Sequence, residues 1–234
     1  IDYYGNNGTI RNNFIEESDG AGIFVDSGYN YTLTNNTFLN VTSRGIGDFG
    51  QFSAINVEGV TWSNNTIINV DSYGIWVNNA TNSSISYNYF SNVTEGIIGG
   101  ADNLTINNNI MDDCGLSYYA GAVGGCISIG AGNIPIDIGN ITVYDNNITN
   151  VEQVGIMVFT GLNVLNNVDV RDNYVQGGLY GLLMTTYASY SERPENVTMS
   201  DNFLVDNNNG IGIYKSYTAR GGANNLITNN WIYN

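Results

Sequence analysis

Two segments near the end of the chain gather residue types that bind acidic sugars. They run TTYASYSERPEN (185–196) and YKSYTARGGANN (214–225), and they hold four tyrosines and three cations: Tyr187, Tyr190, Arg193, Tyr214, Lys215, Tyr217 and Arg220. These three cations are half of the six Lys and Arg residues in the chain. Aromatic rings offer apolar faces to a sugar, and cations favour uronates or other acidic sugars. The alternative is that these Tyr-rich segments only cover the flank of the fold.

The same two segments allow one kind of catalysis. Lys215 or a tyrosine could act as the base that abstracts a proton beside a uronate carboxylate, while Arg or Ca²⁺ holds that carboxylate. The chain contains no histidine, which excludes His-based triads and most zinc sites. Whether the protein is an enzyme stays open at this point, with a non-enzymatic protein favoured and Lys215 the catalytic residue if it is an enzyme.

A column of aspartates is the second candidate site, and it would bind calcium. Asp145, Asp172 and Asp201 each precede an Asn, in positions where other parts of the chain carry residues such as Asn35 and Asn64. Stacked like charges repel, and a Ca²⁺ ion held by their carboxylates would compensate them. The alternative is that they point to water, or accept hydrogen bonds from neighbouring amides or from Arg171. No cofactor is required in either case.

The two cysteines bracket an inserted loop. Cys114 and Cys126 enclose the segment GLSYYAGAVGG, at a place where four other copies of an internal repeat have an interval of only 3 or 4 residues. A disulfide between them would close the loop at its base and imply an oxidising compartment. The alternative is a pair of buried thiols.

Twelve Asn-x-Ser/Thr sequons occur in the chain and predict N-glycosylation at some of them. The leading candidates are Asn7, Asn30, Asn79, Asn82, Asn103, Asn140 and Asn196. We place them ahead of Asn40 and Asn92. The alternative is that an Asn column followed by a Thr-rich strand column produces sequons without any glycosylation, since strands favour Thr.

An internal repeat must position all of these residues. Its nine copies align on one Asn, with an apolar residue three positions before it and two positions after it: Asn13, Asn36, Asn65, Asn88, Asn109, Asn146, Asn173, Asn202 and Asn230. Six residues earlier another Asn occurs in eight of the nine copies, and a Gly-aliphatic step follows further on. Apolar and polar residues alternate with period two, which indicates short strands, and Gly and Asn mark turns because both tolerate positive φ.

Stacking is what such a repeat requires, because one copy cannot bury its apolar side chains alone. Identical Asn side chains in register fall roughly 4.8 Å apart and can form hydrogen-bonded ladders. The sequence therefore predicts an all-β, parallel solenoid of about nine coils with Asn ladders, forming one domain over residues 1–234. The two Tyr-rich segments should lie side by side, because their copies are adjacent. Leucine-rich repeats are the alternative solenoid, but the regular Leu grid that they need is absent.

The pattern resembles the right-handed parallel β-helix repeats of the pectate-lyase-like superfamily, in the style of NosD and archaeal surface-protein repeats. The resemblance rests on the Asn column, its flanking apolar positions and the Gly-aliphatic step, and it covers the whole chain. It implies a single-stranded, right-handed β-helix. It is a weak guide to activity, because the superfamily includes lyases, hydrolases, epimerases, phage tailspikes and surface proteins. The lack of histidine also departs from the polygalacturonase branch.

Composition restricts the partners and the location. A net charge of −15 with a single lysine argues against nucleic acid, and no apolar run approaches the length of about 18 residues that a membrane span needs. An acidic, Lys-poor, Asn-rich chain suits an extracellular or cell-surface location. Neither end shows a cap, so we expect either missing flanking sequence or head-to-tail stacking of copies into a homopolymer.

Two functions follow from these observations. The first is an extracellular structural or adhesive β-helix of a cell surface, sheath or filament, with copies of itself or surface glycans as partners. The second is a carbohydrate-active protein that acts on acidic polysaccharide, as a lyase, an epimerase or a tailspike-like glycan binder. The second would use the Tyr-rich segments together with calcium.

Overall fold

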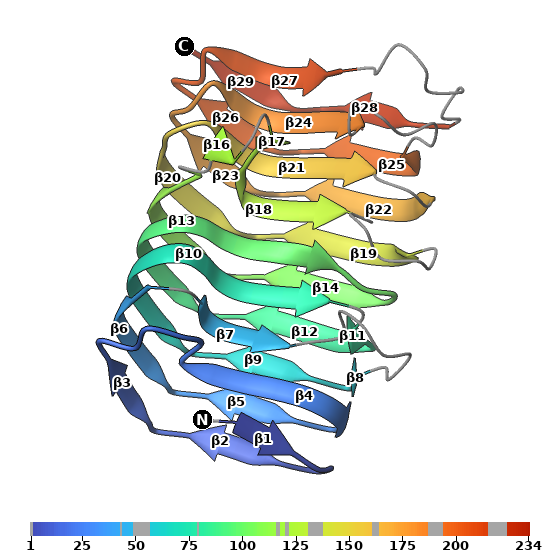
Figure 1. The fold of residues 1–234 in the computed structure, drawn as a ribbon. Coiled ribbons are helices and arrows are strands. Elements are labelled where there is room, and N and C mark those ends of the chain that lie inside the picture. Colours follow the sequence, from blue (N-terminus) through green and yellow to red (C-terminus); the bar gives the residue numbers. More distant parts are fainter. Residues whose placement is uncertain are drawn as a thin grey trace.

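The computed structural model describes residues 2–42, 44–48, 57–78, 80–115, 118–119, 122–130, 138–160, 164–186, 194–214 and 224–234. Within these ranges every regular element is a β-strand. The strands wind into a stack of coils whose first and last turns lie at opposite ends of the molecule (Figure 1). The predicted all-β solenoid is confirmed.

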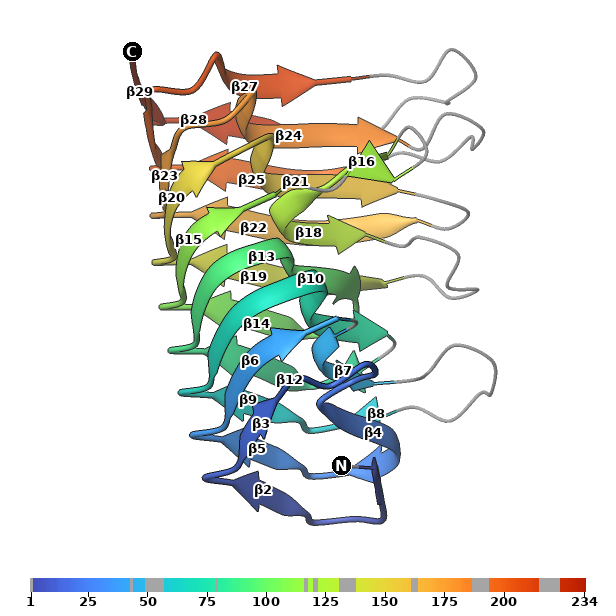
Figure 2. The same ribbon diagram turned by 60° about the vertical axis from the view of Figure 1, so that its left-hand side comes forward.

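Three faces of parallel strands form the sides of the stack (Figures 1 and 2). Face A is a nine-stranded sheet made of β2 (Thr9–Arg11), β5 (Thr32–Thr34), β9 (Thr61–Ser63), β12 (Ser83–Ser86), β14 (Leu104–Asn107), β19 (Ile138–Tyr144), β22 (Leu165–Arg171), β25 (Glu195–Ser200) and β28 (Leu226–Thr228). Face B holds β3 (Phe14–Glu16), β6 (Thr37–Val41), β15 (Ile110–Cys114), β20 (Asn147–Val151), β23 (Tyr174–Gln176), β26 (Phe203–Val205) and β29 (Trp231–Tyr233). Face C holds β1 (Asp2–Tyr4), β4 (Ile23–Tyr29), β7 (Arg44–Asp48), β18 (Gly125–Gly130), β21 (Val154–Thr160), β24 (Tyr180–Thr186) and β27 (Asn209–Ile213).

Two long strands, β10 (Thr66–Asn78) and β13 (Tyr89–Gly100), run through face B and on into face C. The short strands β8 (Val57–Glu58) and β11 (Ala80–Thr81) add to the turn between face C and face A. The one antiparallel pairing among the described strands joins β16 (Tyr118–Tyr119) to β17 (Ala122–Val123) in a small hairpin.

Neighbouring coils pair like with like. On face A, for example, Ile85 pairs with Ile106, which pairs with Val143, which in turn pairs with Val170. These side chains point inward and are fully buried, as are nearly all the apolar positions of the repeat. The alternation of apolar and polar residues thus fills one continuous core between the three faces.

The turns use residues that tolerate the left-handed backbone region. Each coil has such a residue before each of faces A, B and C, and all non-glycine examples except Glu17 and Tyr87 are Asn or Asp. A short polar side chain lowers the cost of positive φ, which explains why the same residue types recur at these positions. The predicted role of Asn and Gly in the turns is confirmed.

A buried column of Asn side chains ties the coils together at the turn between face A and face B. At Asn146, Oδ1 accepts hydrogen bonds from both the backbone N–H and the Nδ2 of Asn109, at 3.0 Å each. Its own Nδ2 donates to Oδ1 of Asn173 at 2.9 Å and to the carbonyl of Ile106 at 3.1 Å. The pattern repeats from Asn13 to Asn230, and the seven Asn residues between them are at most 1% exposed. The predicted Asn ladder is confirmed.

Two further ladders are exposed to solvent at the other turns. In the turn before face A, Nδ2 of Asn30 donates to Oδ1 of Asn7 at 3.0 Å. In the turn before face C, Nδ2 of Asn69 donates to Oδ1 of Asn40 at 3.0 Å, and Nδ2 of Asn92 donates to Oδ1 of Asn69 at 2.9 Å. These bonds link coils at the surface, where each contributes less than a buried one.

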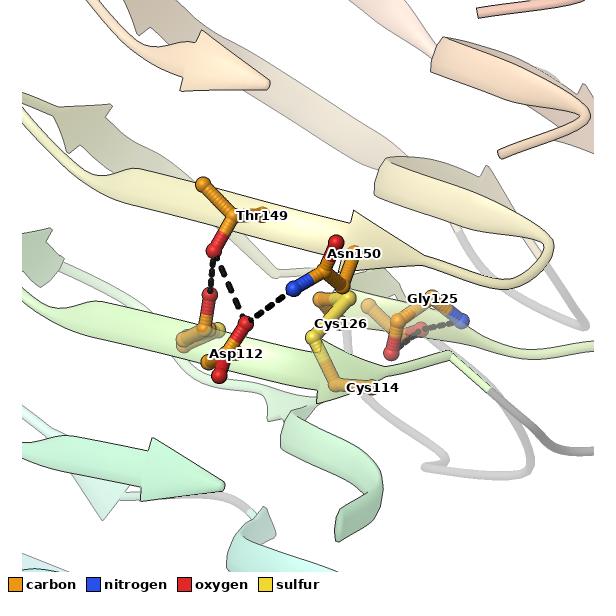
Figure 3. The surroundings of a disulfide bond; sticks show 8 residues. Asp112, Cys114, Gly125, Cys126, Thr149 and Asn150 are labelled. Carbon is orange, nitrogen blue, oxygen red and sulfur yellow. Dashed lines mark hydrogen bonds between the residues drawn. A yellow bond between two sulfur atoms is a disulfide. The ribbon is translucent and has the colours of Figure 1, made fainter. Parts of the chain in front are cut away.

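A disulfide joins Cys114 at the end of β15 to Cys126 in β18, with the two Cα atoms 5.2 Å apart (Figure 3). It closes the base of the segment that carries the β16–β17 hairpin. Beside it, Asp112 accepts hydrogen bonds from Oγ1 of Thr149 at 3.1 Å and from Nδ2 of Asn150 at 2.7 Å (Figure 3). The coil with the longest insertion is therefore fixed both to itself and to the next coil.

The buried ladder predicts that substitutions of two adjacent asparagines change the unfolding free energy by very different amounts. Asn146→Ala would leave the backbone N–H and the Nδ2 of Asn109 without their acceptor in a dry environment, so we expect a loss of roughly 3–5 kcal/mol of unfolding free energy. Asn147→Ala is the control, because its side chain is exposed and makes no hydrogen bond among the described residues; we expect a change within about 0.5 kcal/mol. Urea unfolding monitored by circular dichroism measures both, and equal losses would contradict the ladder's role.

The disulfide gives a second prediction. Replacing Cys114 and Cys126 together by Ser should lower the unfolding free energy by about 2–3 kcal/mol, because the open loop gains conformational freedom in the unfolded chain. A reducing agent should produce a similar loss in the wild type and none in the double variant. Thermal unfolding with and without reductant tests this, and an unchanged wild type would contradict it.

Candidate functional site

The outer surface of face C carries the aromatic and acidic side chains that could form a site. The residue before each Gly-aliphatic step points outward there, and in successive coils this position includes Tyr73, Glu95, Val154 and Tyr180. The residue after the step also points outward. Sequence reasoning did not select this surface, because it followed the residues that recur in the repeat and these positions vary from coil to coil.

The upper part of face C is covered on its outer side. In β21 all seven residues are buried, although alternate residues of a strand point outward. The outward side chains of Val154, Met157, Phe159 and Leu183 form a second apolar cluster outside the coil. In Figures 1 and 2 the β16–β17 hairpin lies at the level of β21 and β24, which are one and two coils beyond the disulfide from which it extends. The hairpin therefore lies on the outer side of face C, near this cluster.

A tyrosine pair lies at the edge of that cluster. The rings of Tyr180 and Tyr214 meet edge to face with centroids 5.6 Å apart, and their hydroxyls are hydrogen-bonded to each other. The ring of Tyr180 lies over Gly212, where a Cβ atom would come within 2.8 Å of two ring carbons. The hydrogen bond to Tyr214 raises the pKa of Tyr180, and desolvation adds to this effect.

Tyr214 is the single member of the predicted sugar-binding set that the structure describes. It is 54% exposed and contacts Tyr180, which the sequence analysis did not select. The other six predicted residues lie outside the described residues: Tyr187, Tyr190, Arg193, Lys215, Tyr217 and Arg220. The proposal that they bind a sugar stays a prediction, as does a catalytic role for Lys215.

A second group of aromatic and acidic residues lies lower on face C, on β10 and β13. Tyr73 and Trp76 are half-buried with ring centroids 6.1 Å apart. Glu95, which pairs in register with Tyr73, is only 6% exposed although it lies on the outer face. An aromatic pair beside a shielded carboxylate is an arrangement that can contact a sugar ring and its hydroxyls. Nothing in the repeat marks these residues, because other coils have different residue types in the same columns.

The three aspartates of the column do not gather into one group in the part of the chain that the structure describes. Among the described residues, which include Asp145, Asp172 and Asp201, no three acidic side chains come together in a group that could hold a metal ion. Asp172 is instead 2.8 Å from Nη1 of Arg171, whose Nε also lies 3.1 Å from Asp169. The guanidinium stacks on the ring of Tyr144, and its pKa is raised chiefly by the hydrogen bond to Asp172. Arg171 therefore compensates one member of the column, Asp172, and calcium binding by the column stays a prediction.

The predicted glycosylation sites lie on the exposed turn ladder, apart from Asn79, which is outside the described residues. All six described candidates are exposed, but five of them donate their Nδ2 to a neighbouring coil: Asn30, Asn82, Asn103, Asn140 and Asn196. Asn40 and Asn92 are exposed ladder residues of the same kind. The structure gives no reason to place the first group ahead of these two.

Parallel strands in three faces around an apolar core, with ladders of like residues at the turns, define a parallel β-helix. The family profile described as "Right handed beta helix region" matches residues 1–175. This match covers most of the 234 residues, and the chain therefore belongs to the right-handed β-helix family. No curated protein sequence matches it.

Solved structures of carbohydrate-active enzymes share the fold. The catalytic domain of a GH87 α-1,3-glucanase has a TM-score of 0.68 at 18% identity, over 93% of this chain and 45% of that chain. A periplasmic alginate epimerase has a TM-score of 0.57 at 14% identity, over 94% of this chain and 50% of that chain. An alginate lyase from Paenibacillus sp. has a TM-score of 0.57 at 11% identity, over 92% of this chain and 79% of that chain. At these identities the likeness shows the fold alone, and the chain spans about half the length of the glucanase and the epimerase.

Within the described residues, the structure contains no helix with the length and apolar character of a membrane span.

The tyrosine pair predicts a change in titration. Tyr214→Phe removes the hydroxyl partner, so the pKa of Tyr180 should fall toward its ordinary value near 10. Because the folded-state pKa is raised, the pair stabilises the fold fully below about pH 10 and loses its contribution as pH rises through the raised value. NMR titration of ¹³C-labelled tyrosine measures the pKa. Tyr89→Phe on face B is the control, and an unchanged Tyr180 titration in Tyr214→Phe would contradict the pairing.

Proposed function

We propose that the protein is an extracellular structural or adhesive β-helix, a component of a cell surface, sheath or filament. The observation that carries this proposal is the use of the turn side chains. At all three turns of the coil they are engaged in coil-to-coil hydrogen bonds, of which those at Asn36, Asn65 and Asn88 are fully buried. The turn side chains therefore join one coil to the next along the whole described stack. The result is an acidic stack of coils tied together by side-chain hydrogen bonds as well as by strand pairing.

The location proposed rests on two further features. The Cys114–Cys126 disulfide fits an oxidising compartment, and the net charge of −15 keeps a repetitive chain soluble. One of the solved structures of the same fold is described as periplasmic. As partners we propose further copies of this chain, stacked head to tail, and surface glycans.

Carbohydrate binding or processing is the second candidate function. It is supported by the outer surface of face C, where Tyr73 and Trp76 on β10 lie beside the shielded Glu95 on β13, and Tyr180 on β24 contacts Tyr214 further along the stack. Glucanases, an alginate epimerase and an alginate lyase share the fold, which shows that this architecture can present such a surface to a polysaccharide. An acidic polysaccharide is the substrate class that the Lys and Arg residues of the two Tyr-rich sequence segments favour.

One set of measurements separates the two candidates. We expect electron microscopy of the purified protein at high concentration to show filaments with an axial repeat of one subunit, and we expect no turnover of acidic polysaccharides with or without chelator. Turnover that Lys215→Ala abolishes would replace the structural proposal with the catalytic one. Binding without turnover, weakened by Tyr214→Ala but not by the control Tyr89→Ala on face B, would support a glycan binder. A monodisperse monomer that binds no glycan would contradict both.

A further inference from the structure

Tyr87 occupies a backbone position that does not suit it. Its φ is 58°, in a turn column where every other described coil has Asn or Asp. A bulky side chain in the left-handed region costs energy that Asn or Asp largely avoids. The ring is 60% exposed and makes no ring contact or hydrogen bond among the described residues. Nothing among the described residues compensates this cost, and the exposed ring is free to contact a group outside the coil.

Asn64 is the residue of the preceding coil in the same column. Its backbone N–H donates to the carbonyl of Ser86 at 3.2 Å, and the buried ladder joins Asn65 directly to Asn88, so Asn64 and Tyr87 face outward one coil apart. Strands of neighbouring coils lie roughly 4.8 Å apart. An atom attached to the Asn64 side chain would therefore lie beside the Tyr87 ring.

Asn64 also begins a sequon, Asn64-Asn65-Thr66, and its Nδ2 can take a sugar without losing a ladder hydrogen bond. The side chain is exposed and makes no hydrogen bond among the described residues. The sequon residues of the turn before face A differ in this respect. Asn82 donates its Nδ2 to Glu58 at 3.0 Å, and Asn103 donates its Nδ2 to Asn82 at 2.7 Å. A sugar on those nitrogens would replace one of the hydrogens of an amide that already serves a ladder.

We propose that Asn64 carries an N-linked glycan whose first sugar packs on the ring of Tyr87. The donor is a lipid-diphosphate-linked oligosaccharide. The bond between C1 of its first sugar and the diphosphate oxygen breaks, the bond between C1 and Nδ2 forms, one Nδ2 proton passes to a base, and the lipid diphosphate leaves. An exposed aromatic face is an apolar platform for a sugar ring, and this contact is what the strained position of Tyr87 provides. In the organism, the modification rests on the extracellular location proposed above.

Asn35 is the internal comparison for this site. It begins the sequon Asn35-Asn36-Thr37, is exposed, has a φ of 55° and makes no side-chain hydrogen bond among the described residues. Its neighbours in the column are Asn12 and Asn64 rather than an aromatic residue. It therefore shares the free amide of Asn64 without the platform, and a glycan there would crowd one on the adjacent coil.

Glycopeptide mapping after secretion from a eukaryotic host tests the site. We expect most molecules to carry sugar at Asn64, a smaller fraction at Asn35, and little or none at the engaged ladder residues Asn30, Asn82 and Asn103. Sugar absent from Asn64, or concentrated on the ladder residues, would overturn the proposal. This host supplies the glycosylation machinery whatever the native location is. A failure here is therefore distinct from a failure of the proposed extracellular function, which native imaging and filament formation test.

Thermal unfolding tests the contact with Tyr87. Thr66→Ala removes the sequon without altering the turn, and we expect it to lower the Tm of the secreted protein by about 2 °C. The same variant made in a bacterial host, without the glycosylation machinery, measures the change in Tm caused by the loss of the Thr66 side chain itself. This change is subtracted from the one measured on the secreted protein. In a Tyr87→Asn background, which keeps the turn, the glycan-dependent shift should vanish. An equal shift in both backgrounds would show that the sugar does not pack on Tyr87 and would overturn that part of the proposal.

Discussion

The buried Asn ladder is the interaction on which the rest of the structure depends. A primary amide in a dry core costs free energy unless its donors and acceptor are satisfied, and here the partners come from the coils on either side. Asn109, fully buried, receives two hydrogen bonds from Asn88 and gives two to Asn146. A shift of one coil by a single residue would break all of these bonds and turn the apolar side chains outward. The ladder therefore fixes the register that the hydrophobic core then fills.

This constraint also explains where the coils are free to differ. Consecutive ladder residues are separated by as few as 21 positions and as many as 37, yet their amide bonds stay between 2.9 and 3.1 Å. The extra residues lie between β15 and β18 and between face C and face A, as the gaps between β18 and β19, β24 and β25, and β27 and β28 show. These additional residues lie outside the turn between face A and face B that the buried ladder occupies. The Tyr-rich segments selected from the sequence lie in the β24–β25 and β27–β28 gaps. The disulfide closes the segment between β15 and β18.

Most of the fold could be predicted from the sequence because its determinants recur. The Asn column, the apolar positions around it and the turn residues each appear in nearly every copy, and Cys114 and Cys126 stand out because they replace Val and Gly in two of these columns. The site could not be predicted in the same way. Tyr73, Trp76 and Glu95 occupy outward columns with no consensus, and the buried cluster around Met157 lies near a hairpin inserted one coil earlier. The aspartate spacing was visible in the sequence. The ion pair in which Arg171 compensates the charge of Asp172 depends on side-chain geometry.

In a solenoid of this kind, the departures from a column are more informative about function than the column itself. A consensus residue reports a demand of the backbone or the core, as Asn does at positive φ or Ile does inside the coil. A residue that violates the demand must be retained for some other interaction. Gly212, in an outward column of face C, makes room for the ring of Tyr180, and Tyr87 departs from a column of Asn and Asp while exposing its ring to solvent. Both positions place an aromatic ring on the surface of the stack, one on face C and one at the turn between face A and face B. The chemistry of this protein is therefore to be sought on its outer surface, in the few coils where the repeat is broken, while the repeat itself maintains the rod.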